Sequence, residues 1–152
     1  MKISGASRVA MPRDRAYALL QDPVVLARCM PGCEGLDKIA ENEYAMRMKM
    51  MLAAVSGKFE GKVRITNAIA PEQFHLHVDG SGKIGFMKGD GLLKLTETEG
   101  ATDVAYEGEV SVGGTIASVG QRLIDSTAKM LIKRFFDKLG GEASRESART
   151  AE

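Results

Sequence analysis

The stretch GGTIASVGQRLIDSTAKMLIKRFFDKLGG, residues 113–141, decides the fold. Apolar side chains recur in it at helical spacing, which predicts one amphipathic helix of about seven turns. We expect the helix to follow Gly113-Gly114 and to end at Gly140-Gly141, because glycine commonly closes helices. A stripe this long must be buried against another element. It consists of Ile116, Val119, Leu123, Ile124, Thr127, Ala128, Leu131, Phe135 and Leu139.

The sequence before this helix, from Tyr44 to Val112, has a period of two instead. Apolar and polar residues alternate through segments 44–52, 59–65, 74–79 and 104–112, and a glycine-rich segment covers residues 80–95. Such alternation is typical of antiparallel strands with one buried face. No other element offers the long helix enough apolar area, so the strands are expected to form a curved sheet around it.

The first part of the chain predicts a strand and two short helices. Residues 2–10 alternate weakly, as in an edge strand, and Arg13–Leu20 follows Pro12 as a helix. Asp22-Pro23 then begins a second helix, VVLARCM, which ends at Pro31-Gly32. The predicted fold is therefore α+β, in the order strand, two short helices, five or six antiparallel strands and one long helix. Residues 1–140 form one domain, and residues 141–152 form a polar tail expected to be disordered.

Composition argues against several classes of function. The formal net charge is +1, and basic residues are not interleaved with aromatic ones, so no nucleic-acid partner is expected. No run of about 20 apolar residues can span a bilayer, and the first residues lack the apolar core of a signal peptide. The two cysteines of RCMPGCEGL have C-x-x-x-C spacing, which suits neither a redox pair nor zinc, so no metal is expected. A cytoplasmic protein with reduced thiols is the interpretation.

Two polar motifs suggest chemistry but have simpler explanations. GSGKIG, residues 80–85, matches G-x-G-x-x-G, yet no helix can follow it in FMKGDGLLKL, so a dinucleotide site is not expected. Glycines that let a strand bend or bulge explain it better. His75, His77 and Asp79 alternate with apolar residues and are expected to face solvent. We therefore predict no catalytic residues.

The methionines carry more information. Met46, Met48 and Met50 share one strand face, and Leu26 and Met30 are available from the short helices. Methionine fills irregular apolar space and adapts to partners of varied shape, so this stripe can line a hydrophobic pocket. On composition alone, however, plain packing in the core is the favoured interpretation of these methionines.

Four stretches together resemble the CoxG family of carbon monoxide dehydrogenase proteins. They are DPVVLARCMPGCEGL, GKFEGKVRIT, GSGKIGFMKGDGLLKL and VGGTIASVGQRLIDSTAKMLIKRFFDKL. The resemblance covers nearly residues 1–139 and implies the START-like (SRPBCC) helix-grip fold, in which a curved antiparallel sheet encloses an apolar cavity with the C-terminal helix. It implies that Asp22, Pro23, Leu26, Cys29, Pro31 and Gly32 form the short helical pair and the turn. Cys29 and Cys33 are then packing residues.

The resemblance also implies a function. The chain is expected to be a non-catalytic accessory protein of a molybdenum hydroxylase of the carbon monoxide dehydrogenase type, at the inner face of the cell membrane. A lipophilic molecule such as a quinone is the expected ligand, without a covalent cofactor. Direct anchoring by the polar tail is not expected.

The predicted ligand-binding residues follow from the side of the strand or helix on which each residue lies, together with the resemblance to the family. They are Leu26, Met30, Met46, Met48, Met50, Phe59, Phe74, Phe86, Ile116, Gly120 and Leu123, with Gly120 expected to leave room at the helix surface. Two alternatives stay open. One is a START-like enzyme of the cyclase or hydrolase type, which needs polar groups inside the cavity. The other is a protein–protein adaptor with a collapsed interior and no ligand.

Overall fold

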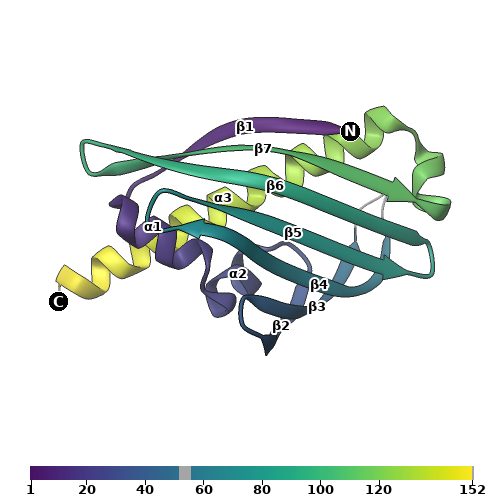
Figure 1. The fold of residues 1–152 in the computed structure, drawn as a ribbon, viewed down its shortest axis with the longest axis horizontal. Helices are drawn as coiled ribbons and strands as arrows, with labels where there is room; N and C mark the ends of the chain where they lie inside the picture. The colour runs from purple at the N-terminus through teal and green to yellow at the C-terminus, as the bar shows by residue number, and fades with distance from the viewer. Residues whose placement is uncertain (52–55, 152) are drawn as a thin grey trace.

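One seven-stranded antiparallel sheet curves around a long C-terminal helix in the computed structural model, which describes residues 1–51 and 56–151 (Figure 1). The strand order is β1-β7-β6-β5-β4-β3-β2. The predicted α+β helix-grip class is confirmed. The elements are β1 (Lys2–Val9), α1 (Arg13–Leu20), α2 (Pro23–Cys29), β2 (Cys33–Ala40), β3 (Glu43–Met51), β4 (Ser56–Ile69), β5 (Gln73–Gly82), β6 (Gly85–Thr98), β7 (Ala101–Gly113), the 3-10 helix η1 (Gly114–Val119) and α3 (Gln121–Ala151).

The two edge strands differ in how well the sequence indicates them. β1 pairs with β7 in continuous register and forms one edge, as its alternation predicts. β2 forms the other edge, and alternation does not indicate it. Its pairing with β3 shifts between Cys33 and Gly35 and again between Lys38 and Ala40. Each irregularity breaks the period of two, so the pattern cannot be read along this strand.

The two short helices close one end of the grip. Asp22 caps α2, because its side chain accepts a hydrogen bond of 2.9 Å from the backbone N–H of Val24. Gly32 then turns the chain with φ of 82°, and an added Cβ there would lie 2.6 Å from the carbonyl oxygen of Lys49. Both the predicted helix and its end at Pro31-Gly32 are confirmed.

The long helix differs from its prediction at both ends. Residues 114–119 form η1, and Gly120, with φ of 98°, separates it from α3, so the helix begins later than expected. At the other end α3 continues through Gly140 and Gly141, so the predicted helix end there is wrong. Leu139 is fully buried and Glu142 pairs with Arg28 at 3.3 Å, contacts that hold the helix on both sides of the glycines. The division of the chain into a domain and a disordered tail at residue 140 stays a prediction.

Buried apolar residues form two clusters of unequal size. The larger one lies between α1, α2, the C-terminal part of α3 and the sheet, and includes Leu20, Phe74 and Leu139. The smaller one lies toward the opposite end and contains Met50, Phe59 and Ile116. Packing is therefore dense at the α1–α2 end, and the N-terminal part of α3 is less closely packed against the sheet.

Candidate functional site

A cavity of about 360 Å³ separates the concave face of the sheet from α3. Its walls are almost entirely apolar side chains from the sheet, α2, η1 and α3. A volume in this range is typical of pockets that hold a small molecule. Residues whose side chains form the walls include Ile3, Leu26, Met30, Met46, Met48, Met50, Phe59, Val63, Leu76, Val78, Met87, Leu93, Tyr106, Val110, Val112, Ile116, Ile124, Thr127, Leu131, Ile132, Phe135 and Phe136.

The methionine stripe of β3 forms one wall. Met46, Met48 and Met50 all line the cavity, and Met46 and Met50 are buried. Leu26 and Met30 face them from α2 and the residue that follows it. The unbranched side chains of methionine adapt to a range of shapes, so this wall suits a ligand that is itself apolar.

Glycines of β6 leave part of the cavity unfilled. Gly89 and Gly91 line the cavity, and an added Cβ at Gly89 would meet no atom within 4 Å. At Gly91 the nearest atom would be the carbonyl oxygen of Glu107, at 3.5 Å. The missing side chains of Gly89 and Gly91 leave space that a Leu or Val would fill. The bend or bulge is predicted for the glycines of residues 80–85, where β5 pairs with β6 without a register shift, so no bulge forms there.

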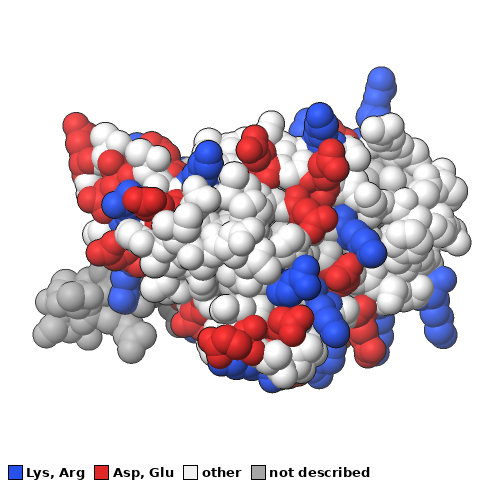
Figure 2. Space-filling model, viewed as in Figure 1, with Lys and Arg blue, Asp and Glu red and all other residues white. Residues whose placement is uncertain are grey.

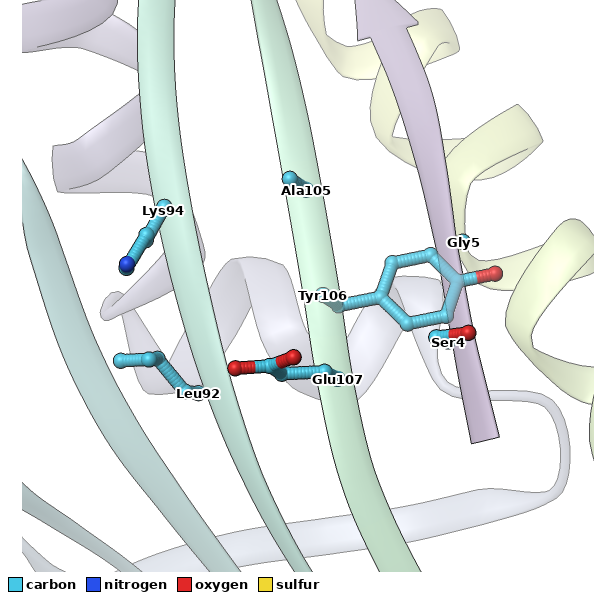
Figure 3. A pocket seen from close by; sticks show the side chains of 7 residues that line it. All are labelled: Ser4, Gly5, Leu92, Lys94, Ala105, Tyr106 and Glu107. Carbon is cyan, nitrogen blue, oxygen red and sulfur yellow. The ribbon is translucent and has the colours of Figure 1, made fainter. Parts of the chain in front are cut away.

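The polar groups of the cavity are few. The hydroxyl of Thr127 donates a hydrogen bond of 2.8 Å to the carbonyl of Leu123, within the helix. The Tyr106 ring stacks on Phe136 with ring centroids 5.8 Å apart, and it extends from β7 over Gly5 of β1 (Figure 3). Asp90 and Glu107 border the cavity from β6 and β7, but alternation directs both side chains to the outer face. A charged ligand would therefore find no counter-charge inside.

A second, smaller pocket of about 220 Å³ lies at β1, β7 and β6 (Figure 3). Leu92, Lys94, Ala105 and Glu107 line it together with Ser4. The mixture of a lysine, a glutamate and small residues has no convergent set of donors or acceptors. We assign no site to this pocket.

Both histidines lie on the outer face of the sheet, as the alternation predicts. His77 is hydrogen-bonded through Nε2 to Thr66 Oγ1, at 2.9 Å, and through Nδ1 to the Asp90 carboxylate. This hydroxyl–imidazole–carboxylate chain has the order of a catalytic triad, but neither of the two pockets is lined by Thr66 or His77. Its members come from β4, β5 and β6, so it links three neighbouring strands.

The cysteines are buried to different extents and neither forms a disulfide. Cys29 is 1% exposed and belongs to the larger core cluster, while Cys33 is half-buried. Burial raises the pKa of both thiols, and in Cys29 the nearby Glu142 carboxylate raises the pKa further. Both are therefore neutral thiols near pH 7, which suits packing. Within residues 1–51 and 56–151 no group of three or more His, Cys, Asp or Glu side chains is placed to hold a metal ion.

Seven of the eleven predicted ligand-binding residues line the cavity. They are Leu26, Met30, Met46, Met48, Met50, Phe59 and Ile116. Sequence reasoning missed most of the α3 wall, including Leu131 and Phe135, although both belong to the apolar stripe read from the sequence. It also missed Gly89 and Gly91, because a residue without a side chain gives no apolar signal.

The other four predicted residues lie elsewhere. Phe74 is 1% exposed in the larger core cluster, where its ring meets Tyr17 edge-on at 5.6 Å. Phe86 is 47% exposed because Met87 and Gly89 take the inward positions of β6. Leu123 is 45% exposed at the start of α3. At Gly120 an added Cβ would meet nothing within 4 Å, so this glycine supplies a backbone conformation and not space against a neighbour.

The family of the chain follows from comparison with known proteins. The profile of the family described as the CoxG subunit of carbon monoxide dehydrogenase matches residues 5–144. The chain belongs to the CoxG family. A conserved protein from Geobacillus kaustophilus, known from a crystal structure, is 31% identical to this CoxG chain. The alignment covers 95% of the CoxG chain and 96% of the Geobacillus protein, with a TM-score of 0.93.

More distant structures share the fold of this CoxG chain. A START superfamily protein from Mycobacterium smegmatis has a TM-score of 0.77 at 12% identity, over 95% of the CoxG chain and 97% of its own. Protein Ms6760 from Mycobacterium smegmatis has a TM-score of 0.72 at 14% identity, over 95% and 92%. These likenesses establish the START-like fold. No curated protein matches the chain. Across the described residues, no helix combines the length and apolarity that a membrane crossing requires.

Proposed function

We propose that this CoxG chain is a non-catalytic accessory protein that holds one lipophilic small molecule in the cavity between sheet and α3. Its partner would be a molybdenum hydroxylase of the carbon monoxide dehydrogenase type, which it would help to couple to the cytoplasmic face of the membrane. One observation carries the proposal: a cavity of about 360 Å³ with almost no polar group inside a member of this family.

Energetics support an occupied cavity. An enclosed, unfilled void costs on the order of 24 cal/mol per Å³, so about 360 Å³ would cost at most roughly 9 kcal/mol, and the part of the cavity that opens to solvent costs less. The whole stability of a typical domain is about 5–15 kcal/mol. Water is a poor filler, because a buried water needs two to four polar partners and these walls offer hardly any. Binding of an apolar ligand is favourable because it removes apolar surface of both the ligand and the cavity wall from water.

A quinone is our candidate ligand. It is uncharged, which suits walls without charges, and its flat ring can stack on aromatic side chains such as Tyr106 and Phe135. The adaptable methionines of β3 can pack against an alkyl chain. A lipophilic electron carrier of this kind would link a soluble oxidising enzyme to electron acceptors in the membrane.

The two alternatives receive less support. An enzyme of the START-like class would need acid–base groups inside the cavity, whereas His75 and His77 lie on the outer face. A pure adaptor with a collapsed interior would need a cavity below about 100 Å³, too small for a quinone ring on the usual scale of pockets. The volume of about 360 Å³ favours a ligand-binding role over it.

The substitution Gly89→Leu tests the proposal because it fills the cavity without removing a contact. The position has an ordinary strand conformation and open space in front of it. We expect the affinity for a decyl-substituted benzoquinone, measured by quenching of tyrosine fluorescence, to fall at least about tenfold. The free energy of unfolding should stay level or rise, since glycine weakens a strand by roughly 0.5–1 kcal/mol.

Thr96→Leu is the matched control, because it adds the same side chain to an exposed position of the same strand. It should bind the quinone as the wild type does. Equal affinity of the folded Gly89→Leu variant and the wild type would contradict the proposal.

A further inference from the structure

The hydroxyl of Tyr106 is a free hydrogen-bond donor on the cavity wall. Among the described residues that line the cavity, only Tyr106 and Thr127 carry a hydroxyl group. The Thr127 hydroxyl already donates to the Leu123 carbonyl within α3. Within residues 1–51 and 56–151, the Tyr106 hydroxyl is hydrogen-bonded to no group of the protein. A ligand that carries an acceptor can therefore use it.

Gly5 of the edge strand β1 determines where this hydroxyl lies. Gly5 is paired in register with Tyr106, and an added Cβ there would lie 2.5 Å from the hydroxyl oxygen and 2.8 Å from Cζ. Because Gly5 has no side chain, the Tyr106 ring can extend from β7 across β1 (Figure 3). Gly5 is exposed and Tyr106 is half-buried, which places the hydroxyl at the rim of the cavity.

The sheet beside Tyr106 has a floor of bare backbone. Gly108 is the next inward position of β7, and its partner on β6 is Gly91. Ile3 of β1, the other partner of Gly108, borders the floor with its side chain. Inward positions that follow one another along a strand are about 7 Å apart, roughly the width of a six-membered ring with its substituents. A flat ring can therefore lie over the two glycines with one edge next to Tyr106.

Aromatic side chains from α3 complete this part of the wall. Phe136 stacks on the Tyr106 ring, and Phe135 meets Phe136 edge-on with ring centroids 5.3 Å apart. All three rings line the cavity. Such contacts hold the Tyr106 ring in place and offer π surfaces to the ring of a ligand.

Charged side chains of β7 point away from this part of the cavity. Glu107 and Glu109 alternate with Tyr106 and Gly108, so they lie on the outer face of the sheet. Figure 2 shows that face, where Lys and Arg are intermixed with Asp and Glu. A ligand oxygen beside Tyr106 would meet a neutral donor, which suits a carbonyl group better than a carboxylate.

We infer that the Tyr106 hydroxyl donates a hydrogen bond to a carbonyl oxygen on the ring of the ligand. The ring lies over Gly91 and Gly108, and the alkyl chain extends toward the methionines of β3. Tyr106 thereby selects lipophilic molecules with a ring carbonyl over hydrocarbons of the same shape. This inference rests on the proposed function, because it assigns a residue to the same cavity.

A structural role for Tyr106 is the alternative. Aromatic side chains stabilise glycines of edge strands by covering them, and that role needs only the ring. The substitution Tyr106→Phe separates the two roles, since it keeps the ring over Gly5 and against Phe136 and removes the hydroxyl alone.

Two ligands of the same shape provide the test. Duroquinone is a benzoquinone with four methyl groups, and durene is the benzene with the same four methyl groups and no carbonyl. The quinone ring is fully substituted, so the thiols of Cys29 and Cys33 do not add to it. By equilibrium dialysis, Tyr106→Phe should bind duroquinone about three- to tenfold more weakly than the wild type, the range for one hydrogen bond between neutral groups. Its affinity for durene should stay within about twofold.

Tyr44→Phe is the matched control. It removes the same atom from a tyrosine that is 7% exposed and does not line the cavity. This variant should bind both ligands as the wild type does. Equal affinity of Tyr106→Phe and the wild type for duroquinone would overturn the inference. So would an equal loss for durene, or the same loss in Tyr44→Phe.

Infrared spectroscopy of bound duroquinone gives a readout that a structural role does not move. A hydrogen bond lowers the stretching frequency of a carbonyl, so the wild type should show one carbonyl band below that of bound duroquinone in Tyr106→Phe. Identical bands in the two proteins would contradict the hydrogen bond. Failure of the proposed function is recognised differently, because the wild type then binds neither duroquinone nor durene.

Discussion

Phe74 and Phe86 differ in what surrounds them, although both lie in strands that border the cavity. Phe74 is packed on all sides in the larger cluster and touches the Tyr17 ring edge-on, whereas Phe86 covers Gly113 at the surface. We expect Phe74→Ala to lower the free energy of unfolding by about 3–5 kcal/mol, through lost contacts and the hole left behind. Phe86→Ala should cost less than about 1 kcal/mol.

Urea denaturation of the two variants beside the wild type measures both costs. Equal destabilisation would contradict the assignment of Phe74 to the core and of Phe86 to the surface.

The sequence predicts which strand residues face the cavity where apolar and polar residues alternate clearly. Met46, Met48 and Met50 alternate with other residues that include Arg47 and Lys49, so the sequence indicates their inward face, and the structure places all three on the cavity. In β6 the inward positions are Met87, Gly89, Gly91 and Leu93, and two of the four have no side chain. Alternation cannot be read through glycines, so the sequence does not show that Phe86 lies on the outer face.

At the scale of elements, two glycines near the ends of the long helix have opposite roles. Gly120 has φ of 98° and ψ of 148°, a conformation that is essentially restricted to glycine, while Gly140 lies within α3. An added Cβ meets nothing within 4 Å at either position. The substitution Gly→Ala therefore changes the free energy of unfolding through backbone conformation and not through a clash. Gly120→Ala should destabilise the fold by about 1–3 kcal/mol. Gly140→Ala should stabilise it by about 0.5–1 kcal/mol, because alanine is the better helix former.

Thermal unfolding of the two alanine variants gives the sign of each effect. A stabilised Gly120→Ala variant would contradict the strained junction between η1 and α3.

The helical stripe predicted that a long helix exists, but not its limits. Helical spacing continues through residues 114–119, where the structure has a 3-10 helix, because the apolar positions of Ile116 and Val119 fit either period. At the other end, glycine propensity indicates a stop, and tertiary contacts of Leu139 and Glu142 outweigh it. Propensity is a weak signal when neighbouring side chains anchor the helix on both sides.

At the scale of the whole molecule, the two ends have different roles. The densely packed end supplies stability, and the open interior toward the other end is available for ligand binding. The larger cluster around α1 and α2 holds the C-terminal part of α3 against the sheet. The N-terminal part of α3 lies farther from the sheet, and the cavity lies between them. The fold class followed from the order of periods in the sequence. The volume of the cavity did not, because it depends on the distance between helix and sheet, which no residue pattern encodes.

Native mass spectrometry of the protein purified from its own host, without detergent, tests the central claim most directly. We predict that the intact chain carries one lipophilic molecule, that organic solvent extracts it for identification, and that Gly89→Leu purified in the same way carries none. A wild-type chain that shows only its own mass in repeated preparations, with the fold intact, would contradict a lipophilic ligand in this cavity.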